Sequence, residues 1–96
     1  MNLLNNTITI TYMQQVKSEN LKKLAKRIKE LRVAQSKSLN KFVFSKGNVT
    51  SATWSRVENG LVDVRITTLV QMASMLGMRI DELLMGVDFN YSQQDD

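Results

Sequence analysis

The sequence contains no cysteine and no histidine. Without cysteine the chain can form no disulfide and offers no thiol nucleophile, and without either residue it lacks the usual ligands of zinc. The absence of histidine also removes the commonest general base of enzymes. These absences argue against catalysis, and nothing in the sequence calls for a metal or another cofactor.

Proline is absent as well and only four residues are glycine, so few residues interrupt regular structure. The 96 residues suffice for one domain, and 43% of them are apolar, which is enough for a core. The scarcity of helix-breaking residues together with this apolar content predicts an all-α fold.

The net charge of +4 is unevenly distributed along the chain. Residues 1–16 carry no charge, whereas residues 17–46 contain ten basic and two acidic side chains, a net charge of +8. Residues 47–79 are nearly neutral, and residues 80–96 contain five acidic side chains and no basic one. The basic segment predicts an anionic partner, although lysines on a helix surface also serve for solvation alone.

No stretch of the sequence approaches the roughly 20 consecutive apolar residues of a membrane span. The N-terminal residues lack the basic and apolar regions of a signal peptide. Residues 21–35 would form a basic amphipathic helix, but its apolar side has no aromatic anchor for a membrane surface. The sequence therefore predicts a cytoplasmic protein without a membrane partner.

Residues 7–12 alternate polar and apolar side chains, most of them β-branched, and this pattern predicts a short β-strand. A single strand is not stable alone, so it would pair with another protein, pair with a second copy or stay disordered. Met13 could serve as an alternative start, in which case residues 1–12 would be dispensable. We therefore treat residues 1–18 as an extension, and all these options remain open.

Residues 19–35 carry apolar side chains at the spacing of one helical face and are predicted to form a helix. The inward face of this helix also contains Arg32, a charge that needs a partner in a core. In a further predicted helix, residues 50–59, Trp54 and Glu58 face inward. Arg32 and Glu58 are therefore predicted to form a structural ion pair, and the indole N–H of Trp54 needs an acceptor.

Two short helices are predicted between residues 38 and 59. The first begins at Ser38, a favourable N-cap, and ends before a Gly-Asn turn signal. The second is capped by Thr50 and ends at Asn59, with Gly60 at the position that favours a left-handed backbone.

Two more helices are predicted over residues 67–76 and 80–85, and the second has an acidic first turn. The whole is a compact five-helix domain over residues 19–86, followed by an acidic polar tail, residues 87–96. Met72 and Met75 lie off the apolar stripe of their helix, which leaves open a contact with a second copy or with the last helix.

The two short helices and their tight turn have the form of a helix-turn-helix unit, whose second helix enters the major groove of DNA. Short polar side chains form most of the outward face of residues 50–59 and would let the backbone approach the bases. Arg56 on the same face is long enough to reach guanine, and capped helix N-termini suit phosphate. The residues that this pattern predicts to contact DNA are Ser38, Thr50, Ser51, Ala52, Thr53, Ser55 and Arg56.

Three parts of the sequence resemble the Cro/phage-repressor-type (XRE) helix-turn-helix family of bacteria and their phages. They are Leu24–Arg32, Ser55–Gly60, and Leu69–Gly77 with Ile80–Leu84, and the resemblance covers about residues 21–85. It implies a lambda-repressor-like domain that binds double-stranded DNA. It also implies base contacts by Ser51, Ala52 and Arg56, phosphate contacts by Thr50, Asn59 and the helix start at Ser38, and an ion pair between Arg32 and Glu58.

The sequence departs from the family pattern at three places. Leu39 stands where the family often has a glutamine that braces the backbone or reads a base. The turn Gly47-Asn48-Val49 is one residue longer than usual, and Trp54 replaces a smaller aliphatic residue. These departures bear on the individual base contacts rather than on the fold.

The leading hypothesis is a sequence-specific DNA-binding regulator of transcription that acts as a homodimer on a two-fold site. The alternative is an antitoxin-like interaction module that binds a partner toxin through residues 7–12 or the acidic tail and autoregulates its operon. An enzyme is not expected, because no nucleophile and base can be paired in this sequence.

Overall fold

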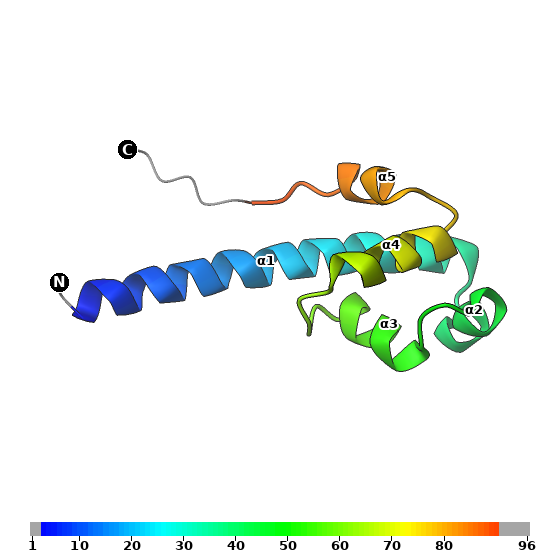
Figure 1. The fold of residues 1–96 in the computed structure, drawn as a ribbon, viewed down its shortest axis with the longest axis horizontal. Helices are drawn as coiled ribbons and strands as arrows, with labels where there is room; N and C mark the ends of the chain where they lie inside the picture. Colours follow the sequence, from blue (N-terminus) through cyan, green and yellow to red (C-terminus); the bar gives the residue numbers. More distant parts are fainter. Residues whose placement is uncertain (1–2, 91–96) are drawn as a thin grey trace.

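The computed structural model describes the backbone of residues 3–90 and the side chains of residues 14–90. This part of the chain folds into five α-helices (Figure 1). They are α1 (Leu3–Gln35), α2 (Leu39–Lys46), α3 (Ser51–Glu58), α4 (Ile66–Met75) and α5 (Ile80–Met85). The predicted all-α class is confirmed, and α2 to α5 lie within one residue of the predicted helix bounds.

The strand predicted over residues 7–12 is wrong, because these residues belong to α1, which begins at Leu3. A single strand would leave its backbone N–H and C=O groups without partners, whereas a longer helix gives each of them an internal hydrogen bond. Lengthening an existing helix also avoids the cost of a second nucleation. Local β-propensity therefore yields to the continuation of α1, and the predicted boundary at residue 18 falls inside this helix.

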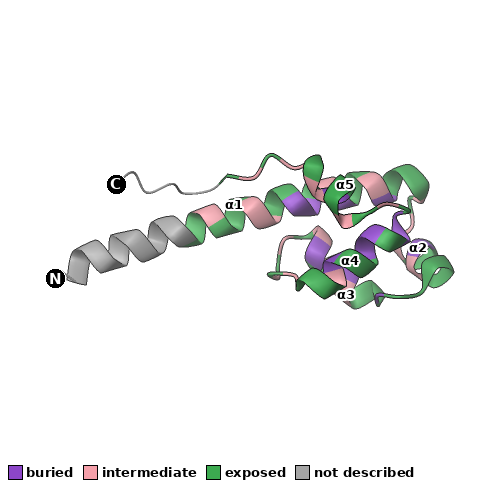
Figure 2. Cartoon of the chain, turned by 45° about the horizontal axis from the view of Figure 1, so that its top comes forward, coloured by how far each residue is buried: buried purple, intermediate pink, exposed green. Residues whose placement is uncertain are grey.

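α1 is the axis on which the other helices are arranged. Its 33 residues span about 50 Å at 1.5 Å per residue, close to the longest dimension of 54 Å. The short helices pack on its C-terminal half, with α3 on one side and α5 on the other, as Figures 1 and 2 show. Residues 3–15, which we call the α1 arm, extend beyond them (Figure 1).

The core receives one large, fully buried side chain from each helix. These side chains are Ile28, Phe42, Trp54, Met72 and Leu83. The rings of Phe42 and Trp54 meet edge to face with their centroids 4.9 Å apart, which joins α2 to α3. Met72 and Met75 are both buried, so neither forms the contact with a second copy that the sequence left open.

The segment after α5, residues 87–90, returns along α1. Phe89 packs against the core, and Val87 beside it is half-buried. The backbone N–H of Asn90 donates to Asn20 Oδ1 at 2.8 Å. The first residues of the predicted acidic tail are thus docked on the domain, and residues 91–96 lie outside the described residues.

No helix in the described range is both long enough and apolar enough to cross a membrane.

Candidate nucleic-acid interface

The inner face of α3 anchors this helix in the core. Trp54 and Val57 are buried, at 0% and 3% exposure. Apolar residues three apart place one side of the helix against α1 and α2, so the opposite side must face solvent. α3 is therefore fixed on one side and open on the other (Figure 2).

The outer face of α3 holds most of the predicted DNA-contacting residues. Ser51, Ala52, Arg56 and Asn59 are exposed, and Ser55 is half-buried beside them. The side-chain amide of Asn59 donates to the carbonyl oxygen of Ser55 at 2.7 Å, and this bond fixes the Asn59 side chain at the C-terminal end of the face. Three of these residues are short, and Arg56 alone extends far from the helix.

The remaining predicted residues lie at the N-terminal ends of α2 and α3. Thr50 is the N-cap of α3, and its Oγ1 accepts a hydrogen bond from the backbone N–H of Thr53 at 3.2 Å. Ser38 caps α2 in the same way by accepting from Lys41 N–H at 3.3 Å. Both caps fix the first helical turn, where free backbone N–H groups attract anions.

Replacing Thr50 with alanine is expected to lower the free energy of unfolding by about 1 kcal/mol, because the first turn of α3 loses its cap. Urea unfolding followed by circular dichroism measures the change, and Thr50→Ser should retain most of the stability. Thr67→Ala is the matched control, since Thr67 is exposed in the first turn of α4 and is not its cap. Equal losses at Thr50 and Thr67 would contradict the role of the cap.

A buried ion pair fixes α3 to α1. Arg32 Nε donates to Glu58 Oε1 at 2.8 Å and Arg32 Nη2 donates to Glu58 Oε2 at 2.9 Å, as the sequence predicted for these two residues. Both side chains are only 6% exposed. The indole N–H of Trp54 donates to the same Glu58 Oε1 at 2.9 Å. Glu58 thus accepts three hydrogen bonds and holds the end of α3 in place.

Arg32 also sets the turn between α1 and α2. Its Nη1 donates to the carbonyl oxygens of Ser36 and Lys37 at 3.2 and 3.0 Å. The hydrogen bonds to Glu58 raise the pKa of Arg32 above its ordinary value, and burial acts in the opposite direction. A raised pKa means that the charged form stabilises the fold below that pKa and the effect is lost only as pH rises through it. Arg32 therefore stays charged at physiological pH.

Basic side chains lie on α2 and beside the end of α3, while α3 carries little charge itself. Lys41 and Lys46 of α2 are exposed, as are several lysines of α1. Lys22 lies beside the end of α3, because a β-carbon built on Gly60 would stand 3.6 Å from the Lys22 backbone. Among the described residues, Arg56 takes part in none of the ion pairs, so its guanidinium is available to a ligand.

The three departures from the family pattern have visible roles in packing. Leu39 is half-buried against the core, where a glutamine would place an amide. Gly47 adopts a left-handed backbone at φ 86°, and Val49 is buried at 6% exposure, so the longer turn is anchored by its last residue. Trp54 fills the space between α2 and α3 and donates to Glu58.

Several contacts that position α1 had no signal in the sequence pattern. Arg27 Nε donates to the carbonyl oxygen of Leu83 at 3.2 Å, and Gln35 Nε2 donates to that of Leu76 at 2.8 Å. Both bonds satisfy carbonyl groups near helix ends, which lack partners within the helix. The last carbonyl groups of every helix need hydrogen-bond donors. This general rule is the one signal in the sequence that could have pointed to Arg27 and Gln35.

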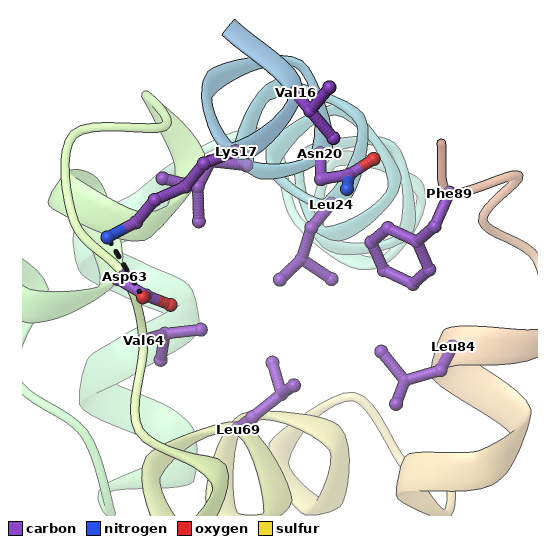
Figure 3. A pocket seen from close by; sticks show the side chains of 10 residues that line it. Val16, Lys17, Asn20, Leu24, Asp63, Val64, Leu69, Leu84 and Phe89 are labelled. Atoms are coloured by element: carbon purple, nitrogen blue, oxygen red, sulfur yellow. Dashed lines mark ion pairs between the residues drawn. The ribbon is translucent and has the colours of Figure 1, made fainter. Parts of the chain in front are cut away.

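An apolar groove of about 500 Å³ lies apart from the predicted DNA-contacting residues (Figure 3). Leu24, Leu69, Leu84 and Phe89 point into it. Lys17 Nζ and Asp63 Oδ2 form an exposed ion pair at its rim, 3.3 Å apart. None of the eight predicted residues lines this groove, so it is not part of the candidate interface.

Among the described residues, no group of three or more acidic side chains is arranged to hold a metal ion. The chemistry that this surface offers is hydrogen bonding by small hydroxyls, backbone N–H groups at two helix starts, and one extended guanidinium. A scan of the sequence against models of known protein families finds no match, and a search of curated proteins finds no similar sequence.

Proposed function

We propose that this protein is a sequence-specific, double-stranded DNA-binding regulator of transcription of the Cro/phage-repressor (XRE) type. In this proposal α3 enters the major groove and the N-terminal ends of α2 and α3 meet phosphate groups. The observation that carries the proposal is the two-sided character of α3, which is buried and fixed on one side and exposed with short polar residues on the other.

The dimensions and chemistry of α3 fit a major groove. An α-helix with its side chains is about 10–12 Å across, which fits a groove about 12 Å wide. Ser51 and Ala52 at the start of the helix allow close approach to base edges. Arg56, one turn later, has the length and the paired N–H donors for O6 and N7 of guanine.

The charge distribution suggests that different residues of the interface supply the affinity for DNA and the selectivity for its sequence. Lys41 and Lys46 of α2 are exposed and Lys22 of α1 lies beside the end of α3, and these lysines would provide attraction to phosphate that does not depend on sequence. α3 carries a single exposed charge, Arg56, because Glu58 is held in the core by Arg32. Affinity would therefore come mainly from the lysines and selectivity mainly from α3.

Replacing Arg56 with alanine is expected to reduce the preference for the cognate site over random DNA by about 10- to 100-fold, since a bidentate contact to guanine is worth about 1–3 kcal/mol. The cognate site is first selected from random fragments at two salt concentrations, which separates specific from charge-driven binding. Competition binding with labelled cognate and random duplexes then measures the preference of each variant.

Arg79→Ala is the matched control because it removes the same charge from an exposed arginine at the start of α5, on the other side of α1 from α3 (Figure 1). This variant should weaken binding to both duplexes about equally and leave the preference unchanged. If Arg56→Ala also leaves the preference unchanged, α3 does not read the bases as proposed.

The antitoxin-like alternative has no support in its strand form. Residues 7–12 are helical, so they offer no extended edge to a partner protein. Only the start of the acidic tail is described, and there Lys23 Nζ donates a hydrogen bond to the backbone carbonyl oxygen of Asp88 at 2.8 Å. DNA binding is therefore the function that the described residues support best.

A further inference from the structure

The α1 arm is a helix without any charged residue. It covers residues 3–15 of α1, and the first charge along the chain is Lys17. Asparagine, threonine and β-branched residues make up most of it, and such a sequence forms little helix alone in water. The arm also lies beyond the helices that cover the rest of α1 (Figure 1). A helix of this kind is expected to be stabilised by a partner.

Four apolar residues follow each other at intervals of four along this part of α1. They occupy positions 4, 8, 12 and 16, which lie on one ridge of a helix, and they are Leu4, Ile8, Tyr12 and Val16. We call these four positions the arm ridge. Past Val16 the same side of α1 becomes charged, with Lys22 and Lys26 exposed on it.

We infer that a second copy of this chain binds antiparallel along the arm ridge and that the two copies are related by a two-fold axis near residue 10. This register places position 4 of one copy opposite position 16 of the other, and position 8 opposite position 12. Each ridge residue thus meets a ridge residue of the other copy, and the same contacts occur on both sides of the axis, as a two-fold interface between identical chains requires. The overlap of residues 3–17 extends over about 22 Å.

The charges favour this partner and this direction. An uncharged ridge offers nothing to an anionic ligand, so nucleic acid and acidic peptides are poor occupants. A parallel pair would bring the +8 segments, residues 17–46, of both copies side by side, whereas the antiparallel pair separates them to opposite ends. The overlap ends at Lys17 because a longer one would place lysines of each copy against the uncharged arm of the other.

Single-cysteine variants test the register in the full chain, which has no cysteine of its own. Asn5→Cys and Gln15→Cys flank the ridge, and in the proposed register position 5 of one copy lies opposite position 15 of the other. A mixture of the two variants should give the 5–15 cross-link on mild oxidation. Ser74→Cys, an exposed position on α4, is the control and should give none. Dominant 5–5 and 15–15 products would indicate a parallel pair and overturn the inference.

Sedimentation equilibrium without DNA tests the ridge itself, so the result does not depend on the proposed function. Ile8→Asp should raise the dimer dissociation constant about 100-fold, since each of the two copies loses one buried isoleucine. The matched control is Asn6→Asp, which adds the same charge off the ridge and should change the constant less than about threefold. Helical circular dichroism should fall on dilution of the unmodified chain as the arm loses its partner.

The arm extends beyond the core, so Ile8→Asp should leave the unfolding transition of the domain unchanged, and a monomeric variant is then not an unfolded one. Equal effects of Ile8→Asp and Asn6→Asp would overturn the assignment of the ridge. An unmodified chain that sediments as a monomer at about 1 mM, the range of very weak association, would overturn the partner itself.

Discussion

Replacing Glu58 with alanine is expected to lower the free energy of unfolding by about 3–5 kcal/mol, because it leaves the charge of Arg32 buried without its partner. Arg32 is 5% exposed and loses two hydrogen bonds from its guanidinium, and the indole N–H of Trp54 loses its acceptor. A small domain has a total stability of about 5–15 kcal/mol, so this variant is near the limit of folding. Urea unfolding followed by circular dichroism measures the loss.

Two further variants separate the buried ion pair from a general effect of removing an acid. Glu30→Ala removes an exposed glutamate 3.9 Å from Lys26 and should cost less than about 0.5 kcal/mol. The double variant Arg32→Met with Glu58→Leu removes both charges and should recover much of the loss, because no buried charge then remains unpaired. Equal losses for Glu58→Ala and Glu30→Ala would contradict the assigned role of Glu58.

The sequence predicted the parts of this fold that local rules decide. Thr50 caps α3 because a hydroxyl at that position can accept from the third backbone N–H of the helix, and Gly60 ends the turn at φ 66°. The ion pair of Arg32 and Glu58 could be predicted as well, since helical spacing placed one charge on each of two inward faces. In each case, rules that apply within a single helix identified the residues involved.

The features that the sequence predicted wrongly, left open or did not reveal depend on partners far away in the chain. The helical state of residues 7–12 follows from the helix that continues after them and not from their own β-propensity. Met72 and Met75 are buried because α4 is covered on more than one side, so its buried face is wider than a single apolar stripe. The bond between Asn20 and Asn90 joins residues 70 positions apart, and no local pattern marks it.

The exposed face of α3 was predictable for the same reason that its buried face was. Trp54 and Val57 define the inward side, and the helical period then assigns Ser51, Ala52 and Arg56 to the outward side. The half-burial of Ser55 was not predictable, because it depends on how closely Asn59 folds back over the end of the helix. Helical period thus gives the side on which a residue lies, and local packing gives the degree of its exposure.

Replacing Trp54 with alanine is expected to lower the free energy of unfolding by about 3–5 kcal/mol, because it opens a cavity between α2 and α3. The indole is 0% exposed and meets the ring of Phe42 edge to face. Trp54→Phe should cost less, about 1–3 kcal/mol, since it keeps an aromatic ring and loses the hydrogen bond to Glu58. Circular dichroism must follow unfolding, as Trp54 is the only tryptophan.

Phe44 provides the matched control for Trp54, because it is an aromatic residue on the neighbouring helix and is 92% exposed. Phe44→Ala removes a ring without opening a cavity and should change stability by less than about 0.5 kcal/mol. If the variants of Trp54 and Phe44 lose equal stability, the ring of Trp54 does not join α2 to α3. If instead only the Trp54 variants lose stability, then Trp54, which departs from the family pattern, is also the residue that fixes α3, the helix proposed to contact the bases.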